Sequence, residues 1–99
     1  PSSLVCLTLS NCNLSDDAFS RDLSKLPQLR ELDLSKNPIC SLPDWVKGLS
    51  SLKMLGLDYC TSLQSLLGLP AVRGLALCGC NSLEKITYQS TSFRLLLFN

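Results

Sequence analysis

Cysteine is the residue type in this 99-residue sequence that is numerous enough, and spaced closely enough, to support chemistry. Thiolates bind zinc, act as nucleophiles and pair as disulfides. The six cysteines are Cys6, Cys12, Cys40, Cys60, Cys78 and Cys80. Cys78 and Cys80 are separated by one residue, so they form no C-x-x-C pair, and no His/Cys set completes a zinc site. The sequence has no histidine, the usual base that activates a serine or cysteine nucleophile.

Other ligand chemistry finds equally little support. Gly74 and Gly79 do not belong to a G-x-x-x-x-G-K-[ST] phosphate loop. The charged residues are scattered along the chain, the net charge is +1, and no basic stripe indicates nucleic-acid binding. No apolar stretch reaches the ~18 residues that a membrane span needs. We therefore expect no catalytic residue, metal or cofactor in this segment, and no nucleic-acid or membrane partner.

The spacing of the leucines predicts the elements that carry the cysteines. The pattern L-x-x-L-x-L-x-x-C-x-L begins at Leu4, and a copy with asparagine at its ninth position begins at Leu29. Further copies begin at Leu52 and Val72, and a partial one begins at Phe93. The starts at 4, 29, 52, 72 and 93 are 25, 23, 20 and 21 residues apart. Leucine-rich repeats have periods of roughly 20–29 residues, so we expect repeats to fill residues 1–99.

Each repeat predicts one short strand. In Leu32-Asp33-Leu34 successive side chains face opposite sides, so both leucines point inward and Asp33 points outward. A single repeat cannot bury its apolar face, and stacking joins the inward leucines into one core. The predicted fold is an α/β solenoid, a segment of a leucine-rich repeat horseshoe. Short parallel strands line its concave face, and irregular or short helical returns form its convex face.

The ninth position of each repeat predicts a structural ladder. Its members are Cys12, Asn37, Cys60 and Cys80. Asparagine there hydrogen-bonds to the backbone of the turn, and cysteine is compact and carries a weak donor. We expect the three ladder cysteines to be reduced thiols of the core. The sequence leaves the redox state of Cys6, Cys40 and Cys78 open.

The returns on the convex side differ in length and composition. Residues 15–26 predict a capped short helix with one apolar face. Residues 42–46 predict one turn of helix, in which Trp45 fills the core. Residues 66–70 predict a compressed, irregular return.

Outward side chains of the predicted strands and their flanks define a candidate binding surface on the concave face. They are Arg30, Glu31, Asp33, Lys36, Lys53, Asp58, Tyr59, Arg73 and Arg94. Both signs of charge occur beside an aromatic ring, and Tyr and Arg often anchor protein partners. A merely solvated surface is the alternative for any one of them.

The turns after the strands carry a family resemblance. Cys60-Thr61-Ser62-Leu63 and Cys80-Asn81-Ser82-Leu83 share a C-x-S-L turn that continues to Leu66 and Ile86. These repeats resemble those of plant intracellular disease-resistance receptors that combine a Toll/interleukin-1-receptor-like domain, a nucleotide-binding domain and leucine-rich repeats. Residues 82–99 resemble the last repeats of that group. Residues 71–73 read Ala-Val-Arg, where the group often has a second proline and Ser-Leu.

The resemblance implies a non-enzymatic protein-recognition role. In that group the repeats contact a pathogen effector or a guarded host protein, and they restrain the nucleotide-binding domain through an intramolecular contact. ATP or ADP is then expected in the parent's nucleotide-binding domain, and the location is cytoplasmic or nuclear. Because the chain starts at a strand and stops inside the fifth repeat, we expect it to be a fragment of a longer chain.

Two other classes stay open as alternatives. The substrate-recruiting repeat domain of a ubiquitin-ligase adaptor also favours cysteine at the ninth position, but it typically continues C-x-x-I-T-D, which is absent. The ectodomain of a leucine-rich repeat receptor would usually show G-x-I-P turns, which are also absent.

Overall fold

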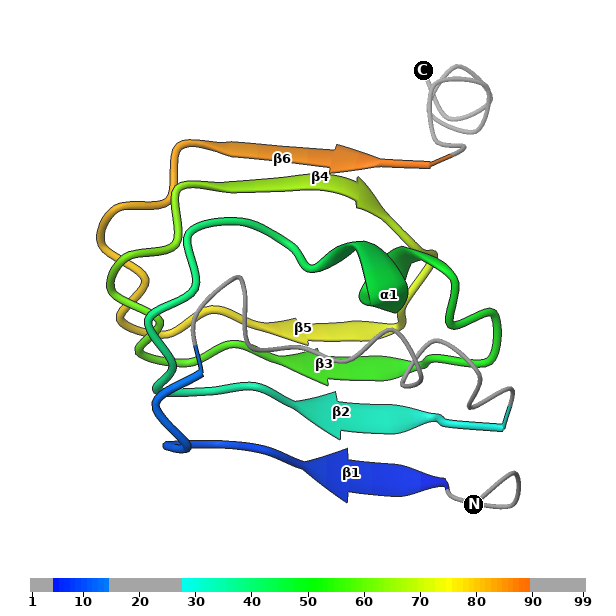
Figure 1. Cartoon of the computed structure of the whole chain (residues 1–99). Coiled ribbons are helices and arrows are strands. Elements are labelled where there is room, and N and C mark those ends of the chain that lie inside the picture. Colours follow the sequence, from blue (N-terminus) through cyan, green and yellow to red (C-terminus); the bar gives the residue numbers. More distant parts are fainter. Residues whose placement is uncertain (1–4, 15–27, 90–99) are drawn as a thin grey trace.

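Two sheets, each made of parallel strands, form the two sides of the molecule. The computed structural model describes residues 5–14 and 28–89. The larger sheet has the order β1 (Cys6–Thr8), β2 (Glu31–Asp33), β3 (Met54–Gly56), β5 (Gly74–Ala76). The smaller sheet pairs β4 (Ser65–Leu69) with β6 (Lys85–Tyr88). The strands of the two sheets run in opposite directions, because the chain crosses one side in β3 and β5 and returns along the other in β4 and β6 (Figure 1).

The register of the larger sheet aligns equivalent leucines. Leu7 pairs with Leu32, Leu32 with Leu55, and Leu55 with Leu75. Each of these leucines holds the fourth position of its repeat. The predicted fold class is therefore confirmed as a solenoid of stacked parallel strands. The predicted fifth repeat, from residue 93, lies outside the described residues, and the repeat boundaries over residues 1–99 stay predictions.

The core lies between the two sheets and is made mainly of leucine. Leu34, Leu57 and Leu63 are fully buried, and Leu55 is 1% exposed. Leu7 and Leu75, in the outer strands β1 and β5, are only partly buried and pack against this core. Replacing a fully packed leucine such as Leu55 by alanine costs about 2–5 kcal/mol, so the stability of the stack comes mainly from its centre.

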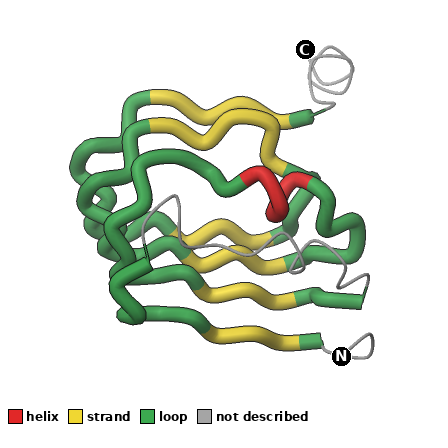
Figure 2. The backbone as a smooth tube through the Cα atoms, in the orientation of Figure 1, coloured by secondary structure: helices red, strands yellow, loops and turns green. Residues whose placement is uncertain are grey.

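The second repeat returns through the helical turn that the sequence predicts. α1 (Asp44–Lys47) begins after Pro43, whose extended backbone (φ −60°, ψ 142°) is typical of the residue before a helix, and it buries Trp45 and Val46. Asp44 and Lys47 form an ion pair of 3.2 Å across this turn. Figure 2 shows α1 as the helical part of the returning chain, on the side of the molecule that carries β4 and β6.

The third return is more regular than predicted, because residues 65–69 form the strand β4. Leu66 and Leu69 are fully buried, and β4 pairs in parallel with β6, with a bulge between these two leucines. An extended residue advances about 3.3 Å and a helical one about 1.5 Å. The shorter third and fourth repeats must therefore cross the molecule as strands. The helix predicted for residues 15–26 lies outside the described residues.

Candidate functional site

The fixed register sorts the outward side chains of the concave sheet into columns. The column at the N-terminal ends of the strands holds Val5, Arg30, Lys53 and Arg73, here called the N-terminal margin. The backbone N–H of Arg30 donates to the carbonyl of Val5 at 2.8 Å, Lys53 to Arg30 at 2.8 Å, and Arg73 to Lys53 at 2.8 Å. Neighbouring strands lie about 4.8 Å apart, so this ladder holds three cations in a row.

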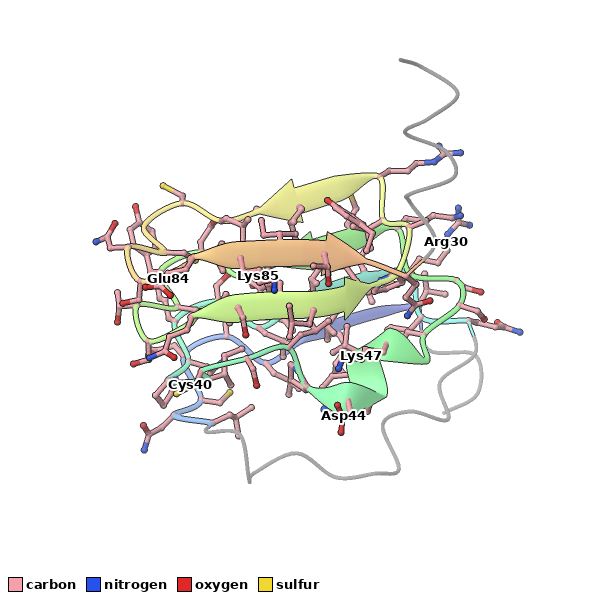
Figure 3. All side chains as sticks on the ribbon, turned by 90° about the horizontal axis from the view of Figure 1, so that it is seen from above. Arg30, Cys40, Asp44, Lys47, Glu84 and Lys85 are labelled. Carbon is pink, nitrogen blue, oxygen red and sulfur yellow. The ribbon has the colours of Figure 1, made fainter. Side chains whose placement is uncertain are left out.

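These cations have no carboxylate partner in the described part of the chain. The ion pair of those residues joins Lys47 to Asp44 on the convex side. Arg30 and Arg73 are exposed, and Lys53 is half-buried. An open hollow of about 400 Å³ lies beside them, and it contains no acidic residue; its lining is Val5, Gln28, Arg30, Ser50, Ser51 and Lys53. Figure 3 shows Arg30 at the opposite end of the molecule from Cys40 and Glu84.

At the C-terminal ends of the strands, side-chain carboxylates accept hydrogen bonds from backbone N–H groups. The column of seventh positions holds Ser35, Asp58 and Cys78, and it forms a second ladder. Ser35 Oγ accepts a hydrogen bond from the backbone N–H of Asp58 at 3.0 Å, and Asp58 Oδ1 accepts one from the backbone N–H of Cys78 at 2.9 Å. Asp33 Oδ1 accepts one from the backbone N–H of Ser35 at 3.0 Å. Sequence reasoning missed this ladder, although a serine and an aspartate at equivalent positions were its signal.

The eighth position of each of the four described repeats turns the chain in the left-handed region. Its residues are Asn11, Lys36, Tyr59 and Gly79, with φ of 53°, 60°, 58° and 75°. Tyr59 is 52% exposed, and its ring lies so close to Gly79 that a side chain there would overlap it. The Cys78 thiol and the Tyr59 hydroxyl are hydrogen-bonded at 3.7 Å, and this contact raises the pKa of Tyr59 above its ordinary value. The turn thus exposes the Tyr59 ring to solvent on one side, and Gly79 lies against it on the other.

The remaining predicted surface residues take different places. Glu31 is exposed, and its carboxylate lies 4.0 Å from the thiol of Cys6 on the preceding strand. Lys36 is exposed beside Tyr59 at the C-terminal ends of the strands. Arg94 lies outside the described residues. The structure brings the described members together on the concave side, and their role in binding a partner stays a prediction.

Asn37 makes more hydrogen bonds than the cysteines of the ninth-position ladder. Its side-chain oxygen accepts hydrogen bonds from the backbone N–H groups of Cys12 at 3.1 Å and Leu14 at 3.0 Å. Its side-chain nitrogen donates to the carbonyls of Leu9 and Leu34, both at 2.9 Å. Three of these bonds join the first two repeats, and the Asn37 side chain that makes them is shielded from water, because Asn37 is 3% exposed.

The ladder cysteines divide into two kinds. Cys60 donates to the carbonyl of Leu34 at 3.3 Å, and Cys80 donates to that of Leu57 at 2.9 Å, each in the preceding repeat. Cys60 is fully buried, and this burial raises the pKa of its thiol. The expectation of a core thiol is wrong for Cys12, which is exposed and donates to Ser10 in its own turn. No repeat in the described chain precedes it, so it has no earlier carbonyl to reach.

Metal sites and membrane-spanning helices also bear on function. Within residues 5–14 and 28–89, no group of three His, Cys, Asp or Glu side chains is arranged to hold a metal ion. In the same ranges, no helix is long and apolar enough to cross a membrane.

Comparison with known proteins identifies the class. A family model described as leucine rich repeat matches residues 2–63. The chain is 40% identical over 68 residues to the TMV resistance protein N of Nicotiana glutinosa, a match that covers 69% of this chain and 6% of that protein. It is 43% identical over 82 residues to a probable disease resistance protein of Arabidopsis thaliana, covering 82% of this chain and 5% of the relative. Disease resistance protein RPS4 of Arabidopsis thaliana is 36% identical over 85 residues, covering 84% and 7%. No solved structure matches the chain.

The stacked strands and their asparagine and cysteine ladder define a leucine-rich repeat module. The chain belongs to the leucine-rich repeat family. Its resemblance to the repeats of plant disease-resistance receptors is confirmed by these relatives. The chain spans 5–7% of the length of the curated relatives it matches, and the match lies in their repeat regions.

Proposed function

We propose that this chain is a protein-recognition surface of a plant immune receptor and that it has no catalytic role. The observation that carries the proposal is the open concave sheet of a chain whose relatives are named disease resistance proteins. Arg30, Tyr59 and Arg73 are exposed on that side, and Asn37 and the buried leucines hold the strands that carry them. A rigid scaffold with exposed Arg and Tyr side chains suits protein binding.

The partner in this proposal is a pathogen effector or a guarded host protein, met in the cytoplasm or the nucleus. A second contact, with the nucleotide-binding domain of the same receptor, restrains that domain until the partner arrives. ATP or ADP belongs to that domain in the proposal, and this segment holds neither. The similarity to disease resistance proteins over 82–84% of the chain supports this assignment over a ubiquitin-ligase adaptor or a receptor ectodomain.

Removal of this segment from the full-length receptor tests the proposal. The receptor is expressed in leaf tissue with and without residues 1–99, and cell death is scored in the presence and absence of the pathogen. A restraining role predicts cell death without the pathogen, and a sensing role alone predicts loss of the pathogen-triggered response. A second variant, in which the lysine of the receptor's phosphate loop is replaced, should suppress the death caused by the deletion.

Two results would contradict the proposal. One is an unchanged response after the deletion in both conditions, with the shortened receptor present at normal abundance. The other is a full-length transcript that encodes an F-box segment or a secretory signal in place of a nucleotide-binding domain. Either result would leave a leucine-rich repeat with a different parent.

A further inference from the structure

The N-terminal margin carries charges that form no ion pair within residues 5–14 and 28–89. At the C-terminal ends of the strands, Asp33 and Asp58 accept hydrogen bonds from the backbone and so help to build the turns. At the N-terminal ends, only backbone groups of Arg30, Lys53 and Arg73 take part in the hydrogen-bond ladder. Their cationic ends form no ion pair with any described residue. The carboxylates at the C-terminal ends therefore stabilise the turns, whereas the cations at the N-terminal ends are available to a partner.

Apolar side chains flank these cations. Val5, in the same column, is 43% exposed, and Met54, in the neighbouring column of β3, is 49% exposed. The Met54 thioether lies over Gly74, and a side chain at Gly74 would overlap it, so Met54 leans toward the next strand. The resulting patch consists of three cations in a row with an apolar side chain at its first strand and another near its centre.

We propose that the N-terminal margin binds an acidic segment of a partner protein. Carboxylates of that segment contact Arg30, Lys53 and Arg73, and one of its apolar side chains packs against Met54 or Val5. The inference rests on the proposed function and deepens it, because it names the chemistry of the partner. Arg contacts carboxylates through a planar fork of donors, and the apolar neighbours exclude water from those contacts.

The same patch suits a nucleic acid less well. The row spans three strands, or about 10 Å, and so meets few phosphates. The acidic Glu31 stands in the column next to it, and the whole chain has a net charge of only +1. A short acidic peptide with an apolar residue meets both features of the patch, whereas a phosphate backbone meets only the cations.

Peptide binding to the full 99-residue chain tests the inference. Fluorescence anisotropy compares three labelled probes, which are a glutamate-rich peptide with one central leucine, the same peptide with lysine in place of glutamate, and a single-stranded DNA of similar length. We expect the glutamate peptide to bind most tightly, and its affinity to fall about tenfold between low and physiological salt.

Charge reversal supplies the matched variants. Arg30→Glu combined with Lys53→Glu should weaken binding of the glutamate peptide at least about tenfold, and should create binding of the lysine peptide. Lys85→Glu introduces the same kind of charge change on β6, where Lys85 is exposed on the smaller sheet (Figure 3), and should leave both affinities within about twofold. An unchanged circular dichroism spectrum shows that the double variant is folded.

Three outcomes would overturn the inference. They are equal affinity for the glutamate and lysine peptides, equal loss of affinity in the Lys85→Glu control, and tighter binding of the DNA than of the glutamate peptide. None of them depends on the cell-death response of the receptor, so failure here leaves the proposed function to its own test.

Discussion

Asp58 joins two repeats through its side chain, since its Oδ1 accepts a hydrogen bond of 2.9 Å from the backbone N–H of Cys78. The backbone N–H of Asp58 in turn donates to Ser35 Oγ at 3.0 Å. Three successive repeats are thus linked at the same position, where each strand ends. The carboxylate that the sequence suggested for partner binding also has this structural role.

The first prediction concerns that carboxylate. Asp58→Ala should lower the free energy of unfolding by about 1 kcal/mol, because the N–H of Cys78 loses its acceptor. Asp58→Asn keeps a side-chain oxygen in the same place and should cost less than Asp58→Ala. Urea denaturation of the two variants measures the difference, and equal losses would show that the hydrogen bond to Cys78 does not stabilise the fold.

Asn37 should be the most sensitive polar residue of the stack. Asn37→Ala leaves the N–H groups of Cys12 and Leu14 and two carbonyls without their partner. We expect a loss of about 3 kcal/mol in the free energy of unfolding, because these groups are buried or partly buried and each lost partner adds to the cost. Asn81→Ala, at an exposed asparagine of the fourth repeat, is the matched control and should change stability by less than about 0.5 kcal/mol. Similar losses in both variants would contradict the ladder.

Lys36 offers a stabilising substitution. It holds φ of 60° at a position where the first repeat has Asn11 with φ of 53°. Asparagine tolerates the left-handed region better than lysine, so Lys36→Asn should raise the free energy of unfolding by about 0.5–1 kcal/mol. Thermal unfolding followed by circular dichroism measures it. A lowered melting temperature would show that the lysine side chain makes a compensating contact.

Ionisation of the Cys60 thiol should make the fold less stable as the pH rises into the alkaline range. Burial raises the pKa of its thiol above the ordinary value of 9.0, so the folded chain keeps this proton when the unfolded chain has lost it. The stabilisation from the neutral thiol is complete below pH 9.0 and disappears as pH rises through the folded pKa. Cys60→Ser, whose hydroxyl does not titrate there, should lose less stability than the parent between about pH 8 and about pH 10 in reducing buffer. Parallel pH profiles would contradict this.

The leucine spacing was enough to predict the concave strands, because only a fixed register puts Leu7, Leu32, Leu55 and Leu75 in one core. It also placed Asn37 and Cys60 at the ladder. The strand β4 was not predicted, since leucines at 66, 67 and 69 fit a strand and an irregular return equally well. The exposure of Cys12 depends on what stacks before it, which the repeat pattern does not contain.

The sequence predicted which residues belong to the candidate site, but it did not predict how they are placed relative to one another. Arg30, Lys53 and Arg73 are 23 and 20 residues apart and look like scattered charges along the chain. The register turns them into one row, and reading the charges by repeat position would have found it. The hydrogen bonds of Asp33 and Asp58 could not be predicted, because they depend on the turn geometry of the following residues.

The central claim is that the concave face recognises a protein partner, and one comparison in the full-length receptor tests it most directly. Alanine replaces Arg30, Lys53, Tyr59 and Arg73 together on the concave side, and Gln64, Glu84 and Lys85 together on the convex side. The pathogen-triggered cell-death response is then measured at equal receptor abundance. We predict that the concave variant loses the response and that the convex variant retains it. A full response from the concave variant would contradict the claim.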